Sequence, residues 1–440
     1  MKKILIISFA ALACCTNAWS QILVNPAETA DLENGFVRIG EFQSTSRNNV
    51  GAAAFLFPKG EKLVTGLHSS ISPDEFLGGL KAVNSMYSQL DYNLVSYGWK
   101  GSSRGFHTID VGARVNYGFS VPREIFQILK TGTAKSPYDL ASLRAFGNLY
   151  GEIAYGYSLP LSDRFSIGAR VKLLAGLHSV DVIARKLELT TNENQYKFDL
   201  DADIDLTNRS KKINADADGF LDYTDFTGKG KLGFPTGGGL ALDLGLQWKP
   251  FDGFRLSASV LDLGGILWYY GNEGRSTGSY SFEGLKNLSM EELNEEKITS
   301  RLKGLGKEVL DVVKPKAVDG CYKFKTVPFT ARLDADYALP FWNRLSVNCS
   351  GLYTGYRFCM PYWEARGGLA LDFPGIAHFG ASAGSGACGF VYGVTGSVNF
   401  LSFKLYAAYE NGIGGVIPYE STPLQANNKN LVIGLVHVIK

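Results

Sequence analysis

The chain of 440 residues has few cysteines, few methionines, no marked excess of either charge, and no long apolar run after its first twenty residues. None of its six cysteines has C-x-x-C spacing, which excludes the common zinc-binding modules. The formal net charge is +2 and there is no basic cluster, so nucleic acid is not an expected partner. Without a second apolar run of about 20 residues, membrane-spanning helices are excluded as well.

The N-terminal residues predict export. A short basic start precedes an apolar stretch over 4–13, which is too short to cross a bilayer, and 18–20 forms a small-x-small cleavage site. We therefore expect a signal peptide over 1–20. Cys14 raises the alternative of a lipoprotein, but Ala11 stands where a lipoprotein signal has a large aliphatic residue.

Alternation of apolar and polar residues is the main signal in the rest of the chain. In 238–249, Leu240, Leu242, Leu244, Leu246 and Trp248 share one face, because side chains at every second position of a strand point the same way. Similar alternation occurs in 106–119, 164–178, 329–339 and 362–372. These segments run to about ten or more residues, which favours membrane-crossing strands over the alternative, a soluble β-sandwich.

The flanking residues point the same way. Short connections with proline alternate with long ones, as periplasmic turns alternate with external loops in bacterial barrels. Tyrosine and tryptophan lie at the predicted strand ends, where an interfacial girdle is expected: Tyr92, Tyr97, Trp99, Trp248, Trp268, Tyr269, Trp342 and Trp363.

The sequence therefore predicts an all-β fold, a transmembrane antiparallel β-barrel of about 14 strands with short periplasmic turns, long external loops and a few loop helices. Both termini would lie on the periplasmic side. The expected strands are 50–57, 90–99, 106–119, 144–159, 164–178, 237–249, 254–267, 325–339, 344–358, 362–373, 376–385, 389–400, 402–410 and 429–440.

The domain prediction follows from this map. Residues 21–49 form an N-terminal periplasmic arm or plug, and 50–440 form the barrel. Within the long loops we expect helices near 73–87, 122–130 and 289–313. Residues 180–206 are expected to form a hairpin that continues beyond the membrane.

Several runs also carry a resemblance: 237–249, 256–264 with Trp268, 72–77, 121–126, and 152–158 followed by 164–174. They resemble an uncharacterised family of Bacteroidota outer-membrane barrels, which is distantly similar to long-chain fatty-acid transporter-type barrels and to accessory barrels of type IX secretion. The resemblance covers most of the mature chain and implies a fold and an outer-membrane location, but no activity and no binding residues. The chain ends in Ile439-Lys440 where proteobacterial barrels have an aromatic residue, which puts assembly details in doubt.

One acidic loop has the spacing of an EF-hand-like calcium site. Calcium takes six to eight oxygen ligands, and carboxylates that alternate around a glycine turn can converge on one ion. The alternative is a solvated acidic turn, favoured by the absence of evident flanking helices. The candidate ligands are Asn214, Asp216, Asp218, the carbonyl of Phe220, Asp222 and Asp225.

The polar strand faces carry both signs of charge, and in a barrel they face the lumen. They would either filter solutes in a water-filled pore or brace the wall as ion pairs, and mixed signs on neighbouring strands favour bracing. The expected lumen-lining charged residues are Asp110, Arg114, Glu152, Arg170, Lys172, Asp243, Lys249, Arg332, Asp334, Asp336, Glu364 and Arg366.

No catalytic arrangement is predicted, and we expect no enzyme. Residues 101–105 match a nucleophile elbow and 384–389 match a dinucleotide fingerprint, but neither lies between a strand and a helix. The five histidines form no ligand spacing. Cys321, Cys359 and Cys388 fall at one end of the strand map, where one disulfide is conceivable, and Cys349 lies mid-strand on the apolar face.

The expected protein is an integral outer-membrane barrel in contact with lipid, a channel or transporter for small, potentially hydrophobic solutes. The alternative is a non-catalytic accessory barrel whose loops or periplasmic arm bind other envelope or secretion proteins. An apolar pocket in the lumen together with a plug would favour transport of an apolar solute. A lumen filled with charges that are paired with one another would count against it.

Overall fold

The computed structural model describes most of the chain, as follows: residues 25–51, 54–60, 62–102, 104–132, 137–192, 197–208, 214–221, 234–269, 271–282, 314–318, 322–356, 361–387, 389–419 and 422–439. The predicted signal peptide, the predicted helix at 289–313 and Cys321, Cys359 and Cys388 lie outside these residues.

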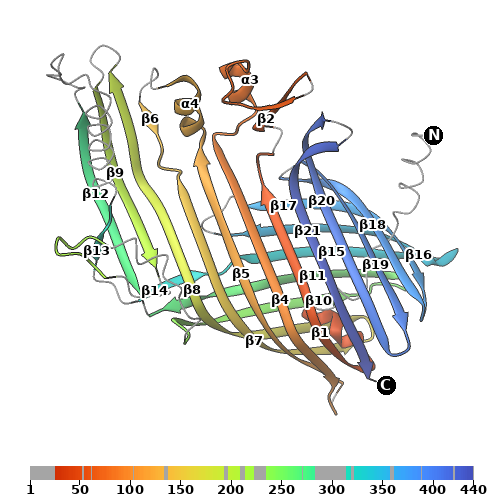
Figure 1. The fold of residues 1–440 in the computed structure, drawn as a ribbon. Coiled ribbons are helices and arrows are strands. Elements are labelled where there is room, and N and C mark those ends of the chain that lie inside the picture. The colour runs from red at the N-terminus through yellow and green to blue at the C-terminus, as the bar shows by residue number, and fades with distance from the viewer. Residues whose placement is uncertain are drawn as a thin grey trace, which may run out of the picture.

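The described chain is almost entirely β-structure with a few short helices (Figure 1). In chain order the elements are η1 (Pro26–Asp31), β1 (Gly35–Asn48), β2 (Leu56–Lys59), β3 (Lys62–Thr65), α3 (Pro73–Gly78), β4 (Val83–Lys100), β5 (Phe106–Pro122), α4 (Arg123–Thr131), β6 (Tyr138–Asp139), β7 (Arg144–Ser162), β8 (Phe165–Asn192), β9 (Lys197–Asn208), β10 (Gly237–Trp248), β11 (Phe254–Trp268), β12 (Asn272–Phe282), β13 (Lys316–Val318), β14 (Lys323–Thr326), β15 (Phe329–Leu339), β16 (Trp342–Gly355), β17 (Tyr362–Phe373), β18 (Ala377–Gly386), β19 (Gly389–Phe400), β20 (Phe403–Tyr419) and β21 (Thr422–Ile439).

Long strands form one closed antiparallel ring of 14. The order around the ring is β1, β4, β5, β7, β8, β10, β11, β15, β16, β17, β18, β19, β20 and β21, and β21 then pairs with β1. At this seam Gly35 lies opposite Ile439. Closure gives every strand two hydrogen-bonded neighbours, which hydrocarbon requires because it offers no partner to a free edge. The predicted fold class is confirmed.

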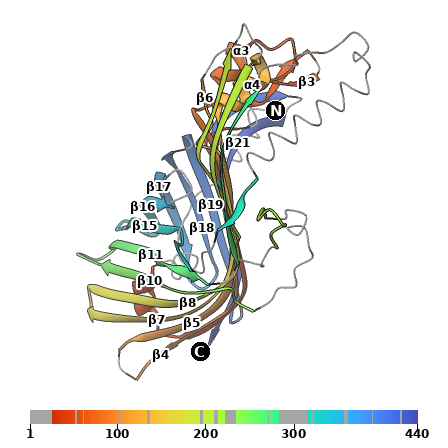
Figure 2. The same ribbon diagram turned by 90° about the vertical axis from the view of Figure 1, so that its left-hand side faces the viewer.

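The two ends of the ring differ. At one, which we call the short-turn end, tight turns join β4 to β5, β7 to β8, β10 to β11, β15 to β16, β17 to β18 and β19 to β20, and the seam ends Gly35 and Ile439 lie there too. At the other, the long-loop end, β4, β5, β7 and β8 rise well beyond the strands opposite them and meet α3 and α4 (Figure 2).

The elements at the long-loop end agree in part with the sequence predictions. The helix expected near 122–130 is α4. The helix expected over 73–87 is shorter, because α3 ends at Gly78 and β4 begins at Val83. The hairpin expected over 180–206 is confirmed, since the upper part of β8 pairs with β9.

The outer surface of the ring is apolar. Leu333, Leu240 and Leu173 are 66%, 60% and 58% exposed, and each belongs to a predicted apolar face. A protein in water would bury such rows, whereas lipid tails solvate them at no cost. No helix in the described part of the chain is long and apolar enough to cross a membrane.

The first strand was predicted wrongly. It was expected at 50–57, but it is β1 at Gly35–Asn48, and Leu56–Lys59 instead forms a small hairpin with β3. The cause is a bulge in β1, where Gly40 has a φ of 68° and the pairing with β21 shifts between Ile39 and Phe42. An extra residue reverses the inward and outward faces, so alternation fails across this strand. The barrel therefore begins at Gly35, inside the region assigned to the N-terminal arm.

Candidate functional site

The N-terminal segment occupies the lumen at the short-turn end. Here η1 packs against β7, β8 and β10, enclosed by the strands (Figure 1). The Oδ1 atom of Asn25 accepts a hydrogen bond from the Ala27 amide at 3.0 Å and so caps the helix. Its Nδ2 donates to the carbonyl oxygens of Leu246 and Ala258 at 3.2 and 3.4 Å. One side chain thus starts the helix and ties it to β10 and β11.

Two further side chains of the segment bond to the wall. Thr29 Oγ1 lies 2.7 Å from Ser158 Oγ. At the open edge, Asp31 accepts hydrogen bonds from Gln247 Nε2 and Lys249 Nζ, both at 2.7 Å. β10 therefore holds the segment near both of its ends, and β7 holds it at Thr29.

Glu28 is the buried acid of this segment. Its Oε1 accepts a hydrogen bond from Ser257 Oγ at 3.0 Å, and only 5% of the residue is exposed. Burial raises the pKa of Glu28 from 4.5 to about 7, while the nearby Arg255 acts in the opposite direction. Glu28 therefore holds its proton in mildly acidic solution and loses it near neutral pH.

A notch of two glycines receives η1. Gly168 and Gly245 are register partners on β8 and β10. A Cβ atom on Gly245 would lie 2.0 Å from Asn25 Oδ1, and one on Gly168 would lie 2.4 Å from the carbonyl carbon of Pro26. Any other residue at either position would have to displace the segment, so the wall is shaped to fit it.

On the long-loop side of η1, a continuous set of ion pairs runs along neighbouring strands of the lumen wall. We call this set the ion-pair belt. It joins strands β1, β4, β5, β7, β8, β10 and β11, and each member lies within 3.5 Å of an oppositely charged one. Its members are Arg38, Glu41, Asp91, Asp110, Arg114, Glu152, Arg170, Lys172, Asp243 and Asp262.

The centre of the belt is fixed by a bulge in β11. Asp262 adopts a φ of 61°, which is rare for a residue with a side chain, and the pairing of β10 with β11 shifts between Leu242 and Leu244. Asp243 Oδ1 accepts a hydrogen bond from the Asp262 amide at 2.8 Å, while its Oδ2 lies 3.0 Å from Lys172 Nζ. The bulge thus places the Asp262 carboxylate in the lumen beside that of Asp243.

The bulge also corrects one sequence prediction. Trp268 was expected in the interfacial girdle, but it is only 1% exposed and lies inside the ring. The extra residue reverses the faces of β11 beyond Asp262, so Ile266 and Trp268 point inward. There they pack with Tyr150, Leu174, Ala241 and Val327 as an apolar cluster on one side of the lumen.

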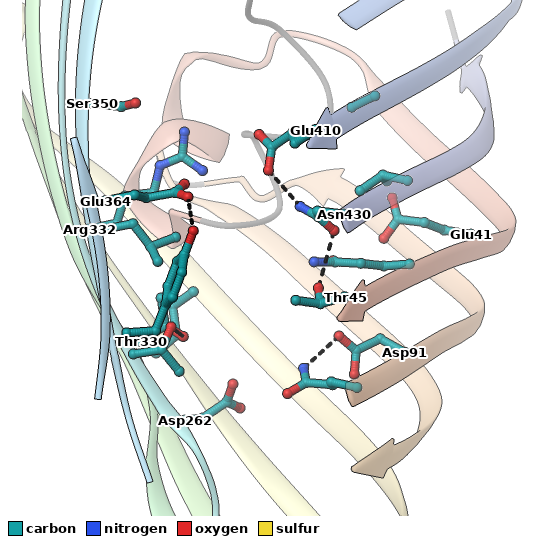
Figure 3. Close-up of a pocket in the computed structure, with 18 of the residues that line it drawn as sticks. Glu41, Thr45, Asp91, Asp262, Thr330, Arg332, Ser350, Glu364, Glu410 and Asn430 are labelled. Carbon is teal, nitrogen blue, oxygen red and sulfur yellow. Dashed lines mark hydrogen bonds between the residues drawn. The ribbon is translucent and has the colours of Figure 1, made fainter. Parts of the chain in front are cut away.

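A polar cavity of about 290 Å³ lies in the lumen, and the members of the ion-pair belt form part of its wall. Carboxylates face it from opposite walls, with Glu41 and Asp91 on one side and Glu364 on the other (Figure 3). Arg366 bridges Glu364 and Glu410 at 2.6 and 2.7 Å. Most charges that line the cavity are therefore paired, and the cavity is suited to a hydrated or charged solute.

Nearer the long-loop end, Arg47 extends the cavity wall. Its guanidinium carbon lies 4.1 Å from the centre of the Tyr362 ring, and Tyr362 in turn donates to Glu364 Oε2 at 2.6 Å. Thr45 donates to Asn430, which donates to Glu410 (Figure 3). These groups offer donors and acceptors close together at the mouth of the cavity.

The predicted lumen residues fall into two groups. Lys249 lies at the short-turn edge and pairs with Asp31. The others line the cavity: Asp110, Arg114, Glu152, Arg170, Lys172, Asp243, Arg332, Asp334, Asp336, Glu364 and Arg366.

Sequence reasoning missed several residues of this site. Arg38 and Glu41 lie on β1, the strand that alternation did not detect. Asp262 follows Leu261 on the inward side, against the period of two. Glu28 precedes the barrel and carries no strand signal. A hint for Asp262 was the Asp-Leu-Gly-Gly run that ends the alternation at 262–265.

The calcium prediction is only partly covered by the described residues, because Asp222 and Asp225 lie outside them. Asp216 Oδ1 accepts the amides of Asp218 and Phe220 at 3.1 and 2.8 Å. A hydrogen bond from Lys314 to its other oxygen, at 2.9 Å, lowers the pKa of Asp216. Asn214 and Asp218 are exposed in the same turn. Among the described residues no group of three or more acidic, histidine or cysteine side chains is placed to hold a metal. Calcium binding stays a prediction.

The remaining sequence candidates lie on the wall. Of the two catalytic-looking runs, Gly101 and Gly105 lie in the connection between β4 and β5, and Gly384 and Gly389 lie on the paired strands β18 and β19. Cys349 is exposed on the outer face and is not in a disulfide.

Comparison with known proteins identifies the family. Residues 30–409 match a family described as a family of unknown function, DUF5723. The chain belongs to this family. The match agrees with the resemblance to an uncharacterised barrel family noted in the sequence. No curated protein matches the chain.

Solved structures give distant likenesses to this DUF5723 chain. A FadL homologue of Pseudomonas aeruginosa has 12% identity and a TM-score of 0.45, and 97% of this chain and 95% of that one are covered. The P. putida toluene transporter TodX has 10% identity and a TM-score of 0.43, with the same coverage. The translocator domain of the Neisseria meningitidis autotransporter NalP has 8% identity and a TM-score of 0.38, with 92% and 89% covered.

Proposed function

We propose that this protein is an outer-membrane channel of a Gram-negative envelope, closed at rest, that admits small molecules from the long-loop end. The observation that carries the proposal is the polar cavity within a closed ring whose outer face is apolar. The ring suits a bilayer, and the cavity offers a passing solute paired charges and hydrogen-bonding groups.

The short-turn end faces the periplasm in this proposal, because bacterial barrels have short periplasmic turns and long external loops. The segment Asn25–Asp31 then acts as a plug on the periplasmic side. The support for this role is its seat in the glycine notch and its hydrogen bonds to three wall strands.

The lining favours a water-soluble solute over the hydrophobic one considered from the sequence. Carboxylate and guanidinium groups alternate around the cavity, and an apolar molecule would have to displace their hydration without replacing it. A zwitterion or a small sugar would meet donors and acceptors at once.

Flux across a reconstituted membrane tests the proposal. Liposomes containing the full mature chain, or a variant lacking Asn25–Asp31, would be diluted into isotonic arabinose or glycine and their swelling followed. We expect slow swelling with the wild type and faster swelling, at least tenfold, with the variant. A folded variant no more permeable than empty liposomes to either solute would overturn the channel function.

A second candidate, an accessory barrel, is favoured by an ordered cap at the long-loop end. Phe76, Leu77, Leu80 and Ile71 form a small core there, joined by Phe126 of α4. A cap with its own core is suited to binding another envelope protein. Crosslinking in cells that captures one partner at equal stoichiometry, with no solute flux in liposomes, would favour this function.

A further inference from the structure

An aromatic cluster surrounds His107 on the outer wall at the short-turn end. We call it the Trp99 cluster: Tyr97, Trp99, His107, Tyr155 and Tyr157. Trp99, His107 and Tyr157 are successive register partners on β4, β5 and β7. They therefore form one row across three strands, at the level where membrane and water meet.

Contacts within the cluster orient the imidazole. The rings of Trp99 and His107 are stacked at 5.2 Å with 11° between their planes, and Tyr157 lies 5.0 Å away on the other side. His107 Nδ1 lies 2.7 Å from the Tyr155 hydroxyl. The imidazole is held by three neighbours while the cluster stays open, since Tyr97 and Tyr155 are 44% and 48% exposed.

The adjoining turn lies close against these rings. A Cβ on Gly101 would lie 2.6 Å from His107 Nε2, and one on Gly105 would lie 2.4 Å from the Tyr157 ring. The turn carries Lys100 and Arg104, both exposed, and has no acidic residue between 100 and 106. In the described part of the chain neither cation takes part in an ion pair. Two cations thus flank an aromatic row at the membrane surface.

We infer that this turn and the Trp99 cluster bind the headgroup of an anionic glycerophospholipid in the leaflet at the short-turn end. Lys100 and Arg104 supply charge for the phosphate, the aromatic row contacts the glycerol and upper acyl region, and His107 and Tyr155 supply polar hydrogens at the boundary. The inference rests on the membrane placement in the proposed function and not on any flux.

A second aromatic site on the outer wall at the short-turn end provides a matched control. At the β19–β20 turn, Phe400 and Phe403 are stacked at 5.7 Å, and His437 lies 4.7 Å from Phe403. This site pairs a histidine with aromatic rings but has no lysine or arginine in the turn 401–402. It therefore has the apolar part of the proposed site without its charge.

Native mass spectrometry of the full mature chain, released from nanodiscs of phosphatidylcholine with phosphatidylglycerol, tests the site. We expect the double variant Lys100→Ala/Arg104→Ala to bind phosphatidylglycerol roughly 30-fold more weakly, because each cation near an anionic surface contributes about fivefold. His107→Phe should weaken binding, and His437→Phe should leave it unchanged.

Each other result counts against the inference. Unchanged phosphatidylglycerol binding in the double variant would overturn it, as would equal losses from His107→Phe and His437→Phe. Equal retention of zwitterionic phosphatidylcholine and anionic phosphatidylglycerol by the wild type would show an apolar surface that does not select an anionic headgroup. All substitutions lie on the exposed wall, and the heat-dependent gel shift of a folded barrel checks that each variant folds.

Discussion

Glu28 makes the seating of the plug depend on pH. Its pKa is raised from 4.5 to about 7, so the folded state binds more protons than the unplugged state between these values. Seating is therefore strongest below about pH 4.5 and weakens as pH rises through 7, by about 3 kcal/mol in total.

The test is the rate at which protease cleaves the N-terminal segment at a series of pH values. We expect cleavage of the wild type to accelerate between about pH 5 and 8. In Glu28→Gln, which keeps the hydrogen bond from Ser257, the rate should not change over this range. Parallel profiles for the two proteins would show that another group controls the seating.

Gly245 is the residue whose substitution should eject the plug with least other damage. In Gly245→Val the new side chain takes the space of Asn25 Oδ1, 2.0 Å from the added Cβ. We expect faster arabinose entry into liposomes, approaching that of the plug deletion. Gly351→Val is the control, because an added Cβ there meets nothing within 4 Å.

At the scale of elements, the bulge in β11 is the feature that unites the belt. Asp262→Ala would leave Arg114 and Lys172 each short of one partner in a buried site, at a cost of about 3–5 kcal/mol. Unfolding by urea in detergent would report this loss. Asp262→Gly should lose slightly less, since glycine accepts the φ of 61° without strain. Equal stability of Asp262→Ala and wild type would mean that the belt does not brace the wall.

Elements differ in how well the sequence predicts them. Strands such as β10 keep strict alternation because one face is the apolar outer surface and the other carries the polar groups of the lumen, so the period of two is visible in the residues. β1 was missed because Gly40 shifts its faces in mid-strand. Trp268 was placed on the wrong side for the same reason, since Asp262 adds a residue to β11. A bulge leaves no dependable mark in a single sequence.

For the site, the sequence predicts which charged residues face the lumen but not which of them pair. Inward charges such as Arg114 and Asp243 follow from the polar face of each strand. Which charges meet depends on the register between strands. Glu41 and Arg170 belong to one network because Arg38 on β1 reaches Asp110 on β5 across β4. The contact of Asn25 with Gly245 joins segments more than 200 residues apart, and no local pattern encodes it.

For the whole molecule, the apolar outer face predicts which reagents reach Cys349. Cys349 is exposed on this outer face. Replacing Cys321, Cys359 and Cys388 by serine leaves Cys349 as the one cysteine of the predicted mature chain. We expect it to react in membranes with an apolar maleimide and not with a charged thiosulfonate. Leu401→Cys, at a turn residue that is 96% exposed, should react with both. Modification of Cys349 by the charged reagent would contradict the membrane placement.

The seam between β1 and β21 imposes an order on assembly. The first and last strands of the ring meet there, and the residues just before β1 are already enclosed by β7, β8 and β10. Either the N-terminal segment enters while the cylinder is still a curved sheet, or it must thread backwards through a finished mouth. In the first route the segment lies against β7, β8 and β10 before β1 pairs with β21. That last pairing would then enclose the segment in the lumen.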